Sequence, residues 1–212
     1  MKFVIEHLEP EIYEWCLIEY EHISKIVGKQ NLMFTNINKK DIKTFKNQRF
    51  LGRQKFKEFF SELKRYGVVF DKSFAELRLN NICVLSQYSK KTLTTNDKNK
   101  FEYFVFGGIL GDNPSKKRTN VLIDNLKKRK IKFSTRNLGN KQMPTDVAVY
   151  AANKILDGKK LDDLKFVDEL EIEINDARTK FGTTYGGNES IVLPFRYVVD
   201  NNKLIINEKL VE

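Results

Sequence analysis

Residue types that build metal centres and membrane spans are scarce in this sequence. It has two histidines and two cysteines, Cys16 and Cys83, which is too few for a zinc site of the usual spacing. Both cysteines lie in apolar stretches, so we expect reduced, buried thiols. No apolar run is long enough to cross a bilayer, and the acidic opening MKFVIEHLEPE lacks the apolar core of a secretory signal. We therefore expect a cytoplasmic protein that binds no metal.

Two common motifs of covalent and nucleotide chemistry are also missing. Neither a GxSxG elbow nor a GxxxxGK[ST] phosphate-binding loop occurs. What is present is a 212-residue chain with 41% hydrophobic and 12% aromatic residues, enough for one substantial core with a small addition. The chemistry that remains is group transfer from a bound small cofactor.

The net charge of +10 is unevenly distributed along the chain. Residues 39–72 hold 11 Lys/Arg against 4 Asp/Glu, and residues 116–136 hold 9 against 1. In contrast, residues 6–21 hold six glutamates and no Lys or Arg. Clustered basic residues suit an RNA phosphate backbone, and solvated helix faces explain them equally well.

Hydrophobic patterning predicts an α/β protein with a small antiparallel addition. Short apolar runs indicate parallel strands at residues 2–8, 31–37, 82–86, 103–106 and 131–134. Helical spacing indicates helices over residues 10–28 and 54–66, a helix beginning at Asn113-Pro114, and one from Pro144 to Gly158. Residues 166–175, with Val167, Leu170, Ile172 and Ile174 as the apolar set, read as a half-exposed strand. Residues 191–199 and 203–207 read as a hairpin.

The chain is organised around residues 104–156. The strand FVF is followed by Gly107, Gly108 and Gly111, which let a ligand approach the backbone closely, and then by Asp112. A second strand is followed by the loop that contains Asn137, Leu138 and Gly139, which leads into the helix near Pro144. Two such loops side by side would form a crevice at the carboxyl ends of parallel strands, where α/β proteins bind ligands.

Three sequence segments carry a resemblance to a known class. GGILGDNP, RNLGNKQMPTDVAV and the opening EHLEPEIYEWCLIEYEHI together resemble the SPOUT-class methyltransferases, in the fungal and archaeal branch that methylates an arginine of a small-subunit ribosomal protein. The resemblance covers essentially the whole chain. It implies a parallel sheet with helices on both faces and a deep C-terminal trefoil knot in about residues 80–158, within a domain of residues 1–158. A β extension over residues 159–212 is expected to pack on that domain.

The resemblance also implies S-adenosyl-L-methionine as cofactor and S-adenosyl-L-homocysteine as product. The cofactor would sit on three knot loops, 85–88, 106–112 and 137–145. Leu138, Met143 and Ile109 would form the apolar walls around adenine, and backbone groups of Gly107, Gly108 and Gly139 would bind ribose and base. The full implied set is Leu85, Ser86, Gln87, Phe106, Gly107, Gly108, Ile109, Gly111, Asn137, Leu138, Gly139, Gln142, Met143 and Thr145. The first loop contains the sequence SQYS, which differs from the acid or proline expected there in this class.

A carboxylate is needed to hold a guanidinium acceptor. It would orient the planar group bidentately and localise a lone pair on one nitrogen. We predict Asp112 first, because it follows the glycine cluster, and then Glu9 and Glu19. Glu19 lies within the apolar stripe of the first helix, where a structural pairing is the competing interpretation.

Two other functions stay open. The basic segments fit an RNA methyltransferase, in which Asp112 would act as a base for a purine nitrogen. A non-catalytic ribosome-binding or RNA-binding knot protein is the third reading. The expected partners are a small-subunit ribosomal protein as substrate and ribosomal RNA, which the basic segments would contact, and no membrane.

Overall fold

The computed structural model describes residues 1–9, 14–37, 56–108, 119–174, 189–207 and 209. Its main element is a six-stranded parallel sheet, which runs in the order β3-β2-β1-β5-β4-β6. The strands are β1 (Lys2–His7), β2 (Leu32–Thr35), β3 (Val68–Val69), β4 (Ile82–Leu85), β5 (Tyr103–Gly108) and β6 (Phe133–Arg136). Every residue of β2 and β4 is buried, which is why these strands read as uninterrupted apolar runs.

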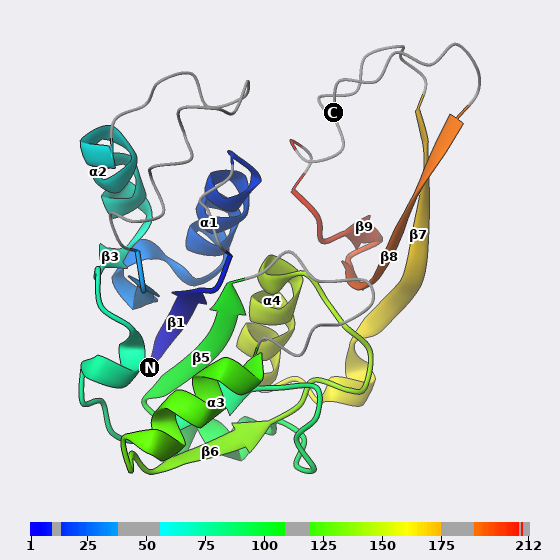
Figure 1. Cartoon of the computed structure of the whole chain (residues 1–212). Helices are drawn as coiled ribbons and strands as arrows, with labels where there is room; N and C mark the ends of the chain where they lie inside the picture. Colours follow the sequence, from blue (N-terminus) through cyan, green and yellow to red (C-terminus); the bar gives the residue numbers. More distant parts are fainter. Residues whose placement is uncertain (10–13, 38–55, 109–118, 175–188, 208, 210–212) are drawn as a thin grey trace.

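Helices cover both faces of this sheet (Figure 1). One face carries α1 (Glu14–Val27), α2 (Phe56–Tyr66) and α4 (Thr145–Leu156), and the other carries α3 (Thr119–Lys128). The side chains of β5 alternate between these faces: Phe104 and Phe106 pack with the α1 and α4 side, whereas Val105 packs with α3. This two-residue period is what one strand between two helical layers requires.

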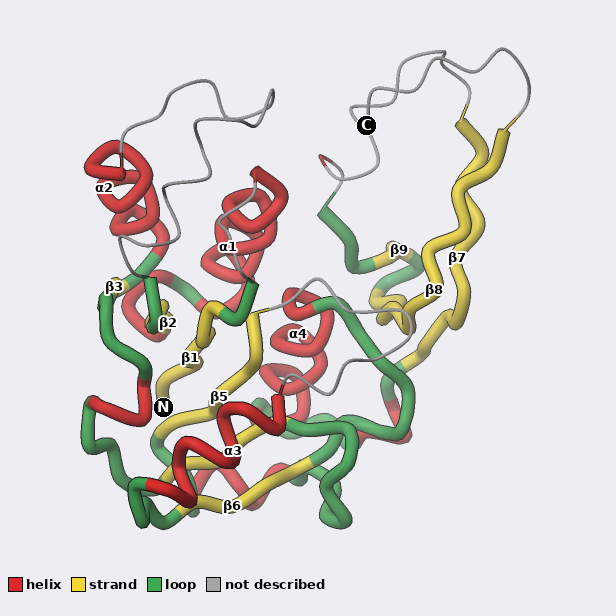
Figure 2. The backbone as a smooth tube through the Cα atoms, in the orientation of Figure 1, coloured by secondary structure: helices red, strands yellow, loops and turns green. Residues whose placement is uncertain are grey.

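A three-stranded antiparallel sheet follows, in the order β7-β8-β9. Its strands are β7 (Lys165–Ile174), β8 (Glu189–Asp200) and β9 (Lys203–Leu204). Figure 2 shows β7 and β8 rising beside α4 as a long ribbon. Tyr197 and Val198 of β8 are buried in the same cluster as Phe104 and Ala152, so the small sheet shares the core of the main domain.

The face of β7 that points to solvent differs from the prediction at one position. The pattern groups Val167 with Leu170, but Val167 is exposed, whereas Phe166 and Leu170 pack on the core. In the described part of β7, Phe166 and Leu170 therefore form the side that faces the core. An irregularity interrupts the pairing of the two strands, because three residue steps in β8, from Arg196 to Leu193, oppose two in β7. On the β7 side it contains Glu169, whose φ is +57°. Pro194, which has no N–H to donate to a ladder, lies within this irregularity.

Two segments far apart in sequence lie side by side beyond the carboxyl ends of β4 and β6. The backbone of Asn137, just after β6, donates its N–H to Lys91 O (2.8 Å) and accepts from Leu93 N (2.9 Å), so it pairs in parallel with Thr92. Residues 86–102, which connect β4 to β5, therefore hold the start of the segment that leads from β6 to α4.

The predicted elements are largely confirmed. The strands at β1, β2, β4 and β5 and the helices α2 and α4 occur where the patterns indicate, and β6 begins two residues later than predicted. The short β3 was not predicted, and the helix start at Asn113-Pro114 lies outside the described residues. Cys16 and Cys83 are free and buried. None of the described helices is long and apolar enough to traverse a bilayer.

Candidate active site

The carboxyl edge of the main sheet brings parts of all three predicted loops together. The second and third loops were predicted to lie side by side. The strands that precede them, β5 and β6, are instead separated by β4. Two hydrogen bonds bridge this separation. Ser86 N, after β4, donates to Arg136 O at the end of β6 (2.8 Å), and Thr145 Oγ1, at the start of α4, donates to Gly107 O of β5 (3.2 Å).

Asn137 fixes the first loop to the third. Its side-chain Nδ2 donates to Ser89 O (2.8 Å), while its Oδ1 accepts from Gly139 N (3.0 Å). Its two backbone groups are used by Lys91 and Leu93. These four contacts within the chain shape the first and third loops, and the contact of Asn137 with the cofactor stays a prediction.

A buried ion pair lies directly beneath these loops. Arg136 donates from Nε to Asp97 Oδ2 (2.9 Å) and from Nη2 to Asp97 Oδ1 (2.8 Å). Thr94 adds its N–H and hydroxyl to the same carboxylate, and the guanidinium of Arg136 lies over the ring of Phe101. Burial alone would raise the pKa of Asp97, but the hydrogen bonds from Arg136 and Thr94 outweigh it and hold the pKa below its usual range. The pair ties the 86–102 connection to β6.

Glu19 joins α1 to the start of α4. Its side chain is 0% exposed, and its Oε1 accepts from Thr145 N (2.9 Å) and Asp146 N (3.3 Å). Pro144 at the N-cap provides no side-chain acceptor, so Glu19 supplies one from another helix. Among the described residues its Oε2 has no hydrogen-bond partner. Burial, and then the charge of Asp146, raise the pKa of Glu19 well above its ordinary value.

Other polar side chains surround Glu19. Asp146 is 2% exposed, and its Oδ2 lies 2.7 Å from Nδ1 of His22 on α1. Tyr197 of β8 is buried nearby: burial, and then the charges of Asp146 and Glu19, raise its pKa. Glu9, half-buried at the end of β1, is close enough for its charge to contribute to the raised pKa of Glu19. An acidic cluster therefore lies where α1, β1 and α4 meet.

Three predicted site residues, Asp112, Gly111 and Ile109, lie outside the described residues. Of the others, Leu85 and Leu138 are buried and Met143 is half-buried against the core. The side chain of Phe106 is used in packing, because its ring stacks on Phe3 with centroids 6.2 Å apart. Any contact of Phe106 with a ligand would come from its backbone. Gln142, also a predicted position, accepts a hydrogen bond from Arg196 N at its backbone oxygen.

Sequence reasoning missed several residues of this region. His22 and Asp146 carried a usable signal: His22 follows Glu19 by three residues on one helix face, and Asp146 lies in the first turn of a helix, where an acid is favoured. Asp97 carried a local signal as well, because it follows Thr94 by three residues in a capping box, but its pairing with the distant Arg136 left none. Arg196 carried none, because it acts on a segment distant in sequence.

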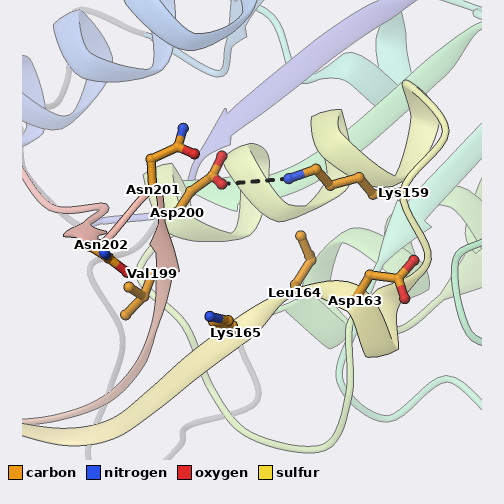
Figure 3. Close-up of a pocket in the computed structure, with 8 residues that line it drawn as sticks. All are labelled: Lys159, Asp163, Leu164, Lys165, Val199, Asp200, Asn201 and Asn202. Atoms are coloured by element: carbon orange, nitrogen blue, oxygen red, sulfur yellow. Dashed lines mark hydrogen bonds and ion pairs between the residues drawn. The ribbon is translucent and has the colours of Figure 1, made fainter.

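A separate hollow of about 570 Å³ lies at the opposite end of α4 (Figure 3). It is lined by Lys159, Asp163, Leu164, Lys165, Val199, Asp200, Asn201 and Asn202, none of which was predicted as a site residue. Asp200 there binds Tyr150 Oη (2.5 Å) and Lys154 Nζ (3.1 Å), and these hydrogen bonds lower its pKa to about 2. The hollow lies between the end of α4 and the β8–β9 turn, and none of the three predicted cofactor loops lines it. Within the described part of the chain, no group of three or more His, Cys, Asp or Glu side chains could hold a metal ion.

Comparisons with known proteins identify relatives along the full length. Residues 2–212 match the family model described as SFM1-like protein arginine N-methyltransferase. The chain is 34% identical over 214 residues to protein arginine N-methyltransferase SFM1 of Saccharomyces cerevisiae, and the match covers 100% of this chain and 93% of the yeast protein.

Solved structures agree with this match. Crystal structures of the yeast enzyme complexed with SAH and with SAM superpose with TM-scores of 0.77 and 0.78, at 30% and 29% identity, over 99% of this chain and 92% and 88% of those chains. Dual-specific Trm10 of Thermococcus kodakaraensis, at 16% identity and a TM-score of 0.54 over 76% of this chain and 95% of that one, shares the fold. The resemblance to the arginine-methylating branch of the SPOUT class is thus confirmed, and the chain belongs to the SFM1-like family of protein arginine N-methyltransferases.

Proposed function

We propose that this chain transfers the methyl group of S-adenosyl-L-methionine to a guanidinium nitrogen of an arginine in a small-subunit ribosomal protein, leaving S-adenosyl-L-homocysteine. The observation that carries the proposal is the full-length likeness to an arginine methyltransferase whose crystal structures contain SAM or SAH. The described parts of the three loops lie at the carboxyl edge of the sheet, which supports the proposal because α/β proteins bind ligands there.

The residues of these loops fit the cofactor. Gly139 has φ +97°, and among the described residues the only atom within 4 Å of the position a Cβ would take there is Arg196 Nη1, at 3.5 Å. The backbone at Gly139 is therefore free to approach a flat ligand. Leu85, Leu138 and Met143 offer apolar surface for adenine, and the backbone of Gly107 and Gly108 offers polar groups for ribose. The bound cofactor supplies a sulfonium methyl that is already reactive.

The chain's own task is to orient the acceptor and to provide a place for its proton. Methylation of a protonated guanidinium releases one proton, and a carboxylate near the acceptor favours this loss. We assign this role first to Asp112, and next to Glu9 and Glu19. Glu19 Oε1 caps α4, so Oε2 is the atom that Glu19 can present to an acceptor.

The path of the chain supports a trefoil knot within about residues 80–158. The sheet order requires the chain to pass from β5 across β4 to β6 and then to return to α4 on the opposite face. On this return it runs against the 86–102 connection, to which Asn137 and Arg136 bind. We propose that the segment threads this connection, and that residues 159–212 form an extension packed on the knotted domain 1–158.

The lysine-rich end of α3 suits a contact with ribosomal RNA. Exposed basic residues gather there, at Lys127, Lys128, Arg129, Lys130 and Lys132. Among the described residues their carboxylate partners are Glu76, 2.8 Å from Arg129, and Asp124, 3.9 Å from Lys127. This excess of positive charge lies on the face away from α4, so RNA bound there would leave the acidic cluster open. The cytoplasm, which contains small subunits, is the proposed location.

Labelling of salt-washed small subunits tests the function. The purified chain is incubated with subunits and methyl-labelled cofactor, and half of the product is treated with RNase. Label that stays in one protein band after RNase supports arginine methylation, whereas label lost with RNase supports the RNA methyltransferase. Failure of the chain to bind the cofactor in a calorimetric titration would favour the non-catalytic reading.

A further inference from the structure

The β7–β8 ribbon is bound to the third cofactor loop through a set of charged residues. The backbone N–H of Arg196 on β8 donates to Gln142 O in that loop (2.9 Å). The Arg196 guanidinium extends over the same loop, with Nη1 3.5 Å from the position a Cβ would take at Gly139. Two points of the loop, three residues apart, therefore face one arginine.

A carboxylate on the neighbouring strand fixes that arginine. Asp168 on β7 is directly opposite Arg196, and accepts from Nε (2.7 Å, Oδ1) and from Nη2 (3.0 Å, Oδ2). Cζ of the guanidinium lies over the ring of Phe166, 4.9 Å from its centroid. A bidentate, stacked arginine has little freedom left, so its position over Gly139 is defined.

The loop itself provides a third contact. Lys141 Nζ donates to Asp168 Oδ2 (2.9 Å), so the carboxylate binds one cation from the ribbon and one from the loop. The hydrogen bonds from Arg196 and Lys141 hold the pKa of Asp168 well below its usual range. The side chains of Arg196, Asp168 and Lys141 are 19%, 33% and 52% exposed, so salt can weaken these bonds.

We propose that Asp168, Arg196 and Lys141 form a clamp that holds residues 139–142 in the conformation required by the cofactor, so that the C-terminal sheet completes the cofactor site. This inference rests on the proposed function. All three are positioning residues, because they act through the loop. Without them the loop would sample other conformations, and binding would have to order it, which weakens affinity.

The test compares variants at matched ion pairs. Asp168→Asn keeps the shape of the side chain and removes the charge that binds both cations, and Lys141→Met removes only the loop contact. Glu76→Gln is the control, because the Glu76–Arg129 pair (2.8 Å, 38% and 50% exposed) is similarly exposed and joins different elements. S-adenosyl-L-homocysteine affinity is measured by calorimetry at low and high salt, with KM for S-adenosyl-L-methionine and kcat measured in parallel.

We expect Asp168→Asn to weaken binding about tenfold and to raise KM with little change in kcat, because the chemistry is not touched. Lys141→Met should give a smaller loss, and Glu76→Gln none. High salt should reduce the difference in S-adenosyl-L-homocysteine affinity between wild type and Asp168→Asn. Equal affinities in all four proteins, or an equal loss in Glu76→Gln, would overturn the clamp.

Hydrogen exchange in the absence of ligand separates this failure from failure of the proposed function. The amides of residues 139–142 should exchange faster in Asp168→Asn than in wild type, while those of β1 and β5 keep their protection. A wild-type chain that binds neither form of the cofactor would overturn the proposed function and the clamp's role in it. Unchanged exchange in residues 139–142 would overturn the clamp whatever the ligand does.

Discussion

Arg136 and Asp97 form a bidentate ion pair, with Nε–Oδ2 and Nη2–Oδ1 distances of 2.9 and 2.8 Å, in which the aspartate is 1% exposed. Removing one partner leaves the other charged and buried, which is strongly destabilising. We predict that Asp97→Ala lowers the free energy of unfolding by about 3 kcal/mol, measured by urea denaturation. Asp157→Ala, at an exposed carboxylate 3.9 Å from Lys98, should change it by less than about 0.5 kcal/mol. Equal stabilities of the Asp97 variant and wild type would contradict this reading.

The same pair predicts a dependence on pH. Since the pKa of Asp97 is below its usual range in the folded chain, its contribution is complete above the unfolded pKa of about 4 and is lost as pH falls through the folded value. The difference in unfolding free energy between wild type and Asp97→Asn should therefore shrink below about pH 4. A difference that grows as the solution is acidified would contradict this assignment.

Glu6 predicts a dependence of the opposite sign. Its carboxylate accepts from Thr35 Oγ1 (2.5 Å), Ser73 Oγ (2.6 Å) and Phe74 N (3.0 Å), yet burial raises its pKa. The folded chain then holds this proton more tightly than the unfolded chain, so stability falls as pH rises from about 4 through the folded pKa. Glu6→Gln should remove this fall, as read from unfolding free energies at several pH values. An identical pH profile for wild type and variant would argue against it.

Two glycines with positive φ separate backbone strain from cofactor binding. Gly139 (φ +97°) lies in the third loop, and Gly158 (φ +118°) follows α4, where no described atom lies within 4 Å of the position a Cβ would take. Alanine at either site should cost about 1–2 kcal/mol of stability. Only Gly139→Ala should also weaken S-adenosyl-L-homocysteine binding, by about tenfold, because it moves the loop. Equal affinities for the two variants in calorimetry would remove the loop from the cofactor site.

Substitutions of Glu19 distinguish the helix cap from the acceptor role. Glu19→Gln keeps an oxygen for Thr145 N, so its stability should match wild type, whereas Glu19→Ala should lose about 1 kcal/mol with the cap. If the Glu19 carboxylate also contacts the arginine acceptor, Glu19→Gln should have a lower kcat although its stability is unchanged. Full activity of Glu19→Gln would restrict Glu19 to capping α4.

How far the sequence could predict this molecule depended on the range of the interaction. Strands such as β1 and helices such as α4 follow from local periodicity, and the Gly158 stop follows from the backbone that glycine allows. The insertion of β4 between β5 and β6 left no local trace, because strand order is decided by which surfaces pack.

In the candidate site too, local features were predictable and long-range contacts were not. The glycine cluster and the Asn137–Gly139 loop could be identified from short sequence motifs. The cap that Glu19 provides spans 126 residues, and the clamp joins Arg196 to Asp168 over 28 residues. Glu19 interrupts the apolar stripe of its helix, so the sequence marks it as unusual, but only the coordinates show that its partner is the start of α4. The Arg196–Asp168 pair leaves no such mark in the sequence. The prediction for Val167 was wrong because the apolar set that includes it mixes odd and even positions, which lie on opposite faces of a strand.

Mass spectrometry of small-subunit proteins tests the central claim most directly. Purified subunits are incubated with the chain and S-adenosyl-L-methionine, and their proteins are digested and fragmented. The account predicts the mass of a methyl group on an arginine of one small-subunit protein, and its loss when Asp112→Asn replaces the wild-type chain. Methyl groups found only on RNA, or on no arginine although the cofactor binds, would contradict it.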